Sequence, residues 1–173
     1  ALTTDYAYIM NDDGTISVSG YTGSDTDLTV PGLIDGYVVT GIADHAFEAN
    51  ADIKSITLPN GLITIGESAF SDCSSLTTVV IPDTVGTIRR GAFISCTALT
   101  TLDIPASVTE IMEEAFTGCT ALKDLTIESS TIEFTNWWVD IDEIPSGLTI
   151  TCPENSKIAA WAEKNNVATE PLS

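Results

Sequence analysis

"AFISCTALTTLDIP", residues 92–105, returns along the chain at a constant spacing and thereby decides the fold. The stretch reads AFTGCTALKDLTIE at residues 115–128 and AFSDCSSLTTVVIP at residues 69–82. Four such repeats align without a gap and begin at Ile42, Ile65, Ile88 and Ile111, so the period is twenty-three. A repeat of fixed period predicts a solenoid, because one short coil cannot bury its apolar side chains alone, whereas stacked coils can.

Each repeat contains a short strand pattern. Residues 99–104, LTTLDI, have the spacing L-x-x-L-x-L, and the last two apolar residues alternate as in a strand with one buried face. Proline follows the pattern at Pro59, Pro82 and Pro105, where it ends strand pairing. The AF segments are too short for a full helix and indicate a helical turn. We therefore expect an α/β leucine-rich-repeat solenoid with a parallel sheet on one face and short helical turns on the other.

The N-terminal part predicts a cap and one more strand. Residues 6–21 alternate in hydropathy on both sides of a turn, which is typical of a β-hairpin. Residues 26–32, TDLTVPG, resemble the repeat strand. The spacing from Pro31 to Pro59 exceeds the period by five, so we expect a five-residue insertion within residues 33–41.

The C-terminal part predicts a divergent repeat and a helix. Adding one period to Leu125 gives Leu148, which indicates a degenerate fifth repeat. Residues 153–166 predict a capping helix with Asn155 or Ser156 as its N-cap. Both ends have a cap, so we expect a complete solenoid domain. We expect one domain over 1–173, with an N-terminal cap and first strand over 1–41, four regular repeats over 42–133, a degenerate fifth repeat over 134–152 and a C-terminal cap over 153–173.

The charge balance excludes two classes of partner. The 173 residues include 6 Lys and Arg against 25 Asp and Glu, which gives a net charge of −19. Such a surface repels nucleic acid phosphates and anionic membranes. No apolar run approaches the roughly 18 residues needed to span a bilayer. We therefore expect neither a nucleic acid partner nor insertion into a membrane.

Three cysteines occupy equivalent places in the repeats. Cys73, Cys96 and Cys119 would stack about one strand spacing, or about 4.8 Å, apart. Three equivalent thiols cannot all pair, and this spacing exceeds the roughly 3.5–4.5 Å between the Cβ atoms of a disulfide. Asn50 continues the column upstream and Asp142 continues it downstream. These residues favour a packing role in a tight turn over a disulfide.

Other patterns give no support for catalysis or metal binding. A linear ladder offers too few converging ligands for zinc, and a catalytic thiol would need a base although His45 is the one histidine. Residues 11–15, NDDGT, lack the spacing of a calcium loop and indicate a hairpin turn. Residues 139–143, VDIDE, could bind a cation weakly but are typical of a solvated loop. We expect no enzyme activity, no cofactor and no metal, and Cys152 has no assigned role.

The exposed side of the predicted sheet, which we expect to be concave, is the first candidate binding surface. Side chains between the buried strand positions point outward. They form two columns, with Ser55, Thr78, Thr101 and Asp124 in the first and Thr57, Val80, Asp103, Thr126 and Thr149 in the second. Threonine rows also suit a strand surface to which nothing binds.

Trp137 and Trp138 are the second candidate. Adjacent tryptophans cannot both point inward on a regular strand, so one could be exposed as an aromatic anchor for a protein or a glycan. Alternatively, both side chains seal the end of the stack.

The repeat resembles a known family. Residues 104–127, IPASVTEIMEEAFTGCTALKDLTI, are similar to the BspA-like leucine-rich repeats of bacterial surface proteins, as are the terminal segments 20–42 and 155–167. Asn50 in the cysteine column, Glu128 in the proline column and the fifth repeat depart from the family pattern. The resemblance implies a curved, non-enzymatic solenoid that is secreted or displayed on the bacterial cell surface.

The resemblance also implies a function in protein recognition or adhesion, with a host or bacterial surface protein as partner. The family has no universal ligand-binding motif, so it assigns no binding residues. One alternative is a structural spacer within a larger surface protein. Another is a glycan-binding module that uses Trp137 or Trp138.

Overall fold

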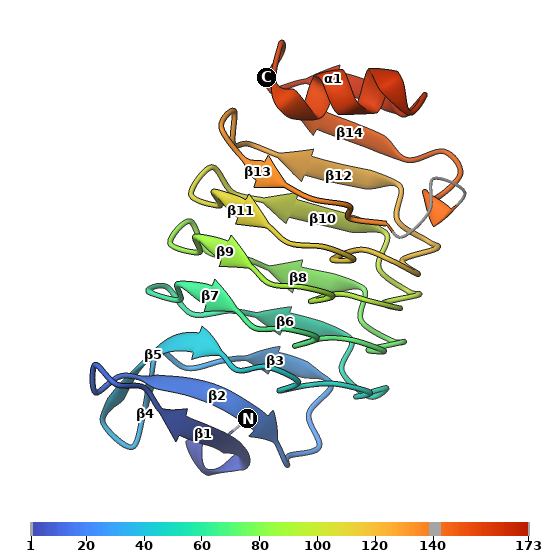
Figure 1. Ribbon diagram of the computed structural model, residues 1–173. Coiled ribbons are helices and arrows are strands. Elements are labelled where there is room, and N and C mark those ends of the chain that lie inside the picture. Colours follow the sequence, from blue (N-terminus) through green and yellow to red (C-terminus); the bar gives the residue numbers. More distant parts are fainter. Residues whose placement is uncertain (1, 139–142, 173) are drawn as a thin grey trace.

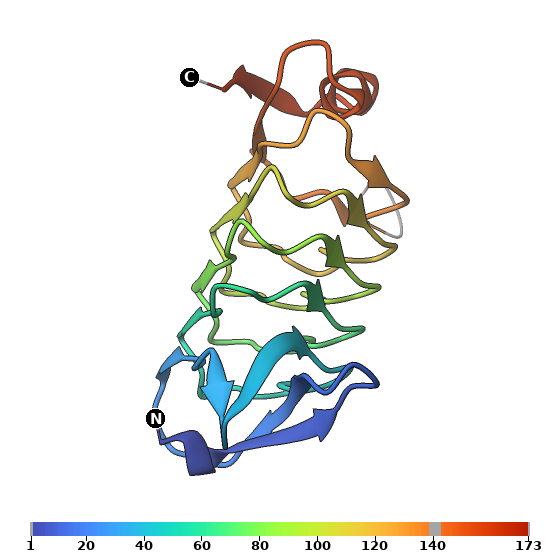
Figure 2. The same ribbon diagram turned by 90° about the vertical axis from the view of Figure 1, so that its left-hand side faces the viewer.

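Each coil of the chain contributes strands to two sheets that lie on opposite sides of the core (Figure 1, Figure 2). The computed structural model describes residues 2–138 and 143–172. The first sheet contains β3 (Asp27–Thr29), β6 (Ser55–Thr57), β8 (Thr78–Val80), β10 (Thr101–Ile104), β12 (Asp124–Ile127), β14 (Thr149–Cys152) and β15 (Ala168–Pro171). All its paired strands are parallel, and backbone pairing is interrupted between β8 and β10.

The structure adds a second sheet to the one that the sequence predicts. Its strands are β1 (Tyr6–Met10), β2 (Ile16–Tyr21), β5 (Tyr37–Ile42), β7 (Thr64–Ile65), β9 (Thr87–Ile88), β11 (Glu110–Ile111) and β13 (Glu133–Phe134), and β4 (Leu33–Ile34) pairs with β5. Strands β7, β9, β11 and β13 have two residues each. Ile65, Ile88 and Ile111 of the first three belong to the column at which each repeat begins, and each of them is buried.

The space between the sheets is filled by columns of equivalent side chains. Phe47, Phe70, Phe93 and Phe116 stack with ring centroids 5.3, 5.4 and 6.3 Å apart. All four rings are at most 2% exposed. Offset stacking of aromatic rings at such distances stabilises a core beyond the area that it buries. The constant period therefore stacks identical side chains on one another along the regular repeats.

Hydrogen-bonded turns take the place of the predicted helical turns. In one coil, Ser71 N donates to Ser68 O at 3.1 Å and Cys73 N to Phe70 O at 3.2 Å. The intervening Phe70 N and Asp72 N instead donate to carbonyls of the next coil, at 2.8 and 2.7 Å. A helix would direct all these donors within one coil. The left-handed backbone of Ser68 and Asp72, with φ of 50° and 58°, turns alternate donors outward from the coil.

The five-residue insertion forms a hairpin. Strands β4 and β5 pair antiparallel around a turn at Asp35 and Gly36, whose φ angles are 51° and 86°. Asp27 pairs with Ser55, which lies five positions beyond one period, and this register confirms the length of the coil.

The fifth coil is two residues longer than predicted. The prediction that Leu148 occupies the strand position of Leu125 is wrong, because Leu125 pairs with Ile150. Leu148 N donates to Pro145 O at 3.1 Å, as Leu122 N donates to Cys119 O at 3.1 Å. Leu148 therefore fills the turn position that precedes the strand.

Both ends of the stack are capped. The predicted N-terminal hairpin is formed by the antiparallel strands β1 and β2, preceded by a short 3-10 helix, η1 (Thr3–Asp5). At the other end, helix α1 (Lys157–Lys164) begins after Ser156, whose hydroxyl accepts a hydrogen bond from Ala159 N at 3.1 Å. In the described part of the chain, no helix is long and apolar enough to span a membrane.

Candidate functional site

The predicted binding residues lie together on the outward side of the first sheet. They come from four neighbouring strands, β6, β8, β10 and β12, and we call them the threonine face. Its members are Ser55, Thr57, Thr78, Val80, Thr101, Asp103, Asp124 and Thr126. The alternate strand residues, such as Ile56 and Leu102, are at most 2% exposed. Four strands at a spacing of about 4.8 Å give the face a height of about 14 Å.

Strand register holds the outward side chains in line. Ser55 pairs with Thr78, and Thr101 pairs with Asp124. Asp124 pairs in turn with Thr149, so the prediction that Thr149 belongs to the second column is wrong. This shift is a consequence of the longer fifth coil.

Five neighbouring members of the threonine face carry no charge: Ser55 and Thr57 of β6, Thr78 and Val80 of β8, and Thr101 of β10. Val80 is the apolar member of this group and is 49% exposed. Asp103 and Asp124 are the charged members of the face, and Asp103 follows Val80 in its column. Lys54 and Lys123 each precede a strand of the face.

One carboxylate at the N-terminal border is held by hydrogen bonds. Asp27 of β3 accepts a hydrogen bond from Ser55 Oγ at 2.5 Å and another from Thr26 Oγ1 at 3.1 Å. These bonds favour the charged form, so the pKa of Asp27 lies below its ordinary value of 3.8. The border is therefore negatively charged and ordered at neutral pH.

The cysteine ladder lies in the core and contributes no site. Each Sγ donates to the phenylalanine carbonyl of the preceding coil, from Cys73 at 3.1 Å, from Cys96 at 3.1 Å and from Cys119 at 3.0 Å. All three thiols are free and buried, as the packing interpretation predicts. Asn50 serves the same turn through Oδ1, which accepts from Ile53 N. Asp142, predicted to extend the column, lies outside the described residues.

Cys152 is the last residue of β14 and is also free and buried. It belongs to the core of the first sheet. Burial raises the pKa of its thiol, and a hydrogen bond to Ser156 opposes that shift.

The predicted aromatic anchor is not available at the surface. Trp137 and Trp138 are 2% and 5% exposed, so both side chains seal the end of the stack. Trp138 stacks on Trp161 of α1 with ring centroids 5.9 Å apart, and Trp137 packs on Phe134 at 4.9 Å. Both can point inward because the two tryptophans lie in an irregular segment after β13 rather than in a strand. The glycan-binding hypothesis required an exposed ring and is therefore corrected.

Of the two loops considered for cation binding, the structure describes the first. In the hairpin turn at residues 11–15, Asp13 accepts hydrogen bonds from the backbone and hydroxyl of Thr15 at 2.9 and 2.6 Å. Residues 139–142 of the second loop lie outside the described part. Within residues 2–138 and 143–172, no group of three or more His, Cys, Asp or Glu side chains could hold a metal ion.

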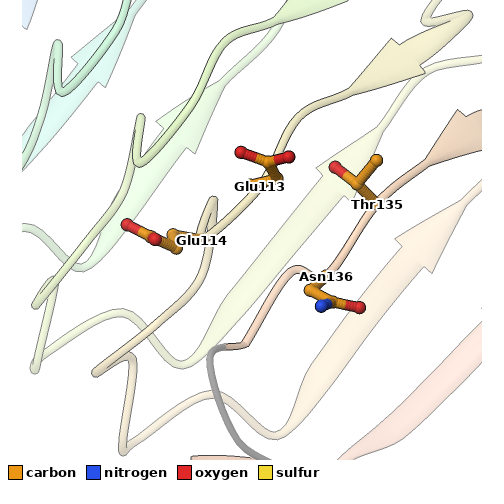
Figure 3. A pocket seen from close by; sticks show the side chains of 4 residues that line it. All are labelled: Glu113, Glu114, Thr135 and Asn136. Carbon is orange, nitrogen blue, oxygen red and sulfur yellow. The ribbon is translucent and has the colours of Figure 1, made fainter.

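Figure 3 shows a hollow that the sequence does not reveal, lined by Glu113, Glu114, Thr135 and Asn136. Its volume is about 360 Å³. Glu114 is paired with Arg90 Nη2 at 2.9 Å on the side of the neighbouring coil. The hollow offers carboxylates but no arrangement of a general acid and base, so we assign no chemistry to it.

Comparisons with known proteins agree with this architecture. Residues 40–140 match the family described as BspA type leucine rich repeat region, in six copies. A leucine-rich repeat protein from Bacteroides capillosus is 31% identical with a TM-score of 0.65, over 72% of this chain and 95% of that one. A search of curated proteins finds no significant match.

Two further solved structures are similar. A leucine-rich cell surface protein from Faecalibacterium prausnitzii is 29% identical with a TM-score of 0.62, over 95% of this chain and 45% of that one. A leucine-rich repeat protein from T. pallidum has a TM-score of 0.80 over 88% of this chain and 71% of that one. Its identity of 24% supports the fold alone.

Proposed function

Since the chain belongs to the BspA-type leucine-rich repeat family, we propose that it is a non-enzymatic module for protein recognition at the bacterial cell surface. The similarity to a protein described as a leucine-rich cell surface protein supports the proposed location. An extended, rigid surface of parallel strands suits a macromolecular partner better than a small ligand. Adhesion to a host or bacterial surface protein is the form of recognition that we propose.

The group of five uncharged side chains on β6, β8 and β10 carries this proposal. The cores of protein interfaces are depleted in charged residues, because charges that leave water without a partner are expensive to bury. Docking on Ser55, Thr57, Thr78, Val80 and Thr101 would strip water from hydroxyl groups and one apolar side chain only.

The border of the face can supply specificity. Lys54 and Lys123 precede strands that lie three coils apart, and Asp103 and Asp124 lie on β10 and β12. A partner with complementary charges would dock in one orientation only. We therefore propose an uncharged contact centre with a charged rim.

Two matched valines test the proposal. Val80 on the threonine face is 49% exposed, and Val38 on the hairpin of β4 and β5 is 48% exposed. An array of purified extracellular proteins, probed with the wild-type domain, provides binding partners. For each partner, Val80→Lys should weaken binding by at least about tenfold, as expected for the centre of an interface.

Val38→Lys is the control, because it makes the same substitution at equal exposure outside the face. Binding that survives Val80→Lys, or that both variants weaken equally, would refute the threonine face as the binding surface. An array without any partner would instead favour a spacer function. Circular dichroism of both variants verifies that the fold is retained.

A further inference from the structure

Strand β1 forms the N-terminal end of the second sheet (Figure 1). It pairs with β2 on one side, and no described strand pairs with its other side. Its five residues, Tyr6–Met10, include no charged residue and no proline. Ile9 and Met10 are 52% and 53% exposed. An unpaired strand edge with exposed apolar side chains is a template for pairing with another chain.

The other three outer strands of the two sheets have the features that usually prevent such pairing. Asp27 lies in β3 and Glu133 in β13, while β15 contains both Glu170 and Pro171. Charged side chains and proline on an edge strand oppose the addition of a further strand. Strands β4 and β8 also lack both and have one paired side, but they have two and three residues against the five of β1. Among the described strands, β1 is therefore the longest edge without such a feature.

The surroundings of β1 specify the charge of a partner. Residues 1–53 contain nine acidic side chains and no Lys or Arg. Asp5 precedes the strand, Asp12 and Asp13 follow it, and Asp35 accepts a hydrogen bond from Tyr8 Oη at 3.0 Å. The strand edge is thus apolar along its length and flanked by carboxylates at both ends.

We propose that the free edge of β1 accepts an extended segment of a partner protein, with apolar residues at its centre and Lys or Arg at its ends. Backbone hydrogen bonds to the edge would provide affinity, and the carboxylates would select a basic segment. A second copy of this chain is disfavoured as the occupant, because each copy would bring the same flanking carboxylates, those of Asp5, Asp12, Asp13 and Asp35, to the contact. This surface is independent of the threonine face.

A fluorescent peptide of sequence Lys-Lys-Val-Thr-Ile-Thr-Val-Lys-Lys is the probe, and the same peptide with Glu in place of Lys is its control. We expect the basic peptide to bind the full chain, as measured by fluorescence anisotropy, and to bind more weakly as NaCl rises from about 50 mM to about 500 mM. Amide NMR shifts should concentrate on residues 6–10. Met10→Lys should weaken binding by at least about tenfold, because it places a like charge beside the edge.

Val80→Lys adds the same charge at similar exposure on the threonine face, away from β1. This variant should bind the peptide within about twofold of the wild type, the range expected for surface substitutions away from a contact. Equal binding of the acidic peptide, or equal loss in Met10→Lys and Val80→Lys, would overturn the proposal. Sedimentation that shows a dimer dissociated by Met10→Lys would also overturn it, since the occupant would then be a second copy.

Discussion

The thiols of the cysteine ladder should be nearly inert toward a thiol reagent in the folded protein. Cys73 and Cys96 are completely buried, Cys119 is 1% exposed, and each Sγ donates to a backbone carbonyl. The perturbation is the addition of 5,5′-dithiobis(2-nitrobenzoic acid) to the native chain at pH 8. The reagent reacts with thiolate, so both access and ionisation limit the rate.

The ionisation factor follows from burial. Burial raises the pKa of Cys73 from its ordinary value of 9.0 to about 12. It raises the pKa of Cys119 to about 12 as well and raises that of Cys96 further. At pH 8, a thiol with the ordinary pKa is about one-tenth thiolate, whereas a pKa of about 12 leaves about one part in ten thousand. Ionisation alone should therefore slow labelling about 1,000-fold.

The assay compares native protein with protein in 6 M guanidinium chloride, by absorbance of the released thiolate. The unfolded chain should release four equivalents at once, because all four cysteines are free. The native chain should release almost none on that timescale. Rapid native labelling at Cys96, located by mass spectrometry, would refute the packing role, and fewer than four equivalents after unfolding would indicate a disulfide.

Phe93→Ala should lower the free energy of unfolding by about 3–5 kcal/mol, the range for truncation of a buried phenylalanine. Its ring is fully buried and stacks on Phe70 at 5.4 Å and on Phe116 at 6.3 Å. Urea unfolding measures the loss, and a value below about 1 kcal/mol would contradict the stacked core. The carboxyl of Asp27 should titrate below 3.8 by NMR. Because this pKa is lowered on folding, its contribution to stability is present above the unfolded pKa and disappears as pH falls through the folded pKa. Ser55→Ala should return the pKa of Asp27 toward 3.8, and an unchanged pKa would show that Ser55 is not the cause.

The first sheet and both caps could be predicted from the sequence because they rest on periodicity and on local signals. The alternation in LTTLDI, residues 99–104, has a single interpretation once it recurs with a constant period. Ser156 is an N-cap residue that precedes a run with apolar residues on one helical face, and this local pattern is enough to indicate where the helix begins. The outward direction of Thr78 and Thr101 follows from the same alternation.

The remaining features depend on backbone geometry that periodicity does not specify. A strand such as Thr64–Ile65 is too short to show alternation, so the second sheet leaves no pattern beyond its isoleucine column. Ser68 and Asp72 adopt a left-handed backbone although neither is glycine, so no glycine marks these turns in the sequence. Leu148 and Ile150 both fit an apolar strand position, and only pairing distinguishes them.

Photo-crosslinking from one strand of each sheet within the same coil tests the threonine face most directly. Thr78 lies on β8 of the first sheet, and Thr87 lies on β9 of the second sheet. Each is replaced in turn by a photoreactive phenylalanine analogue and irradiated with a partner identified on the array. We predict a crosslinked complex from position 78 and none from position 87. A complex formed from position 87 alone would contradict recognition through the threonine face.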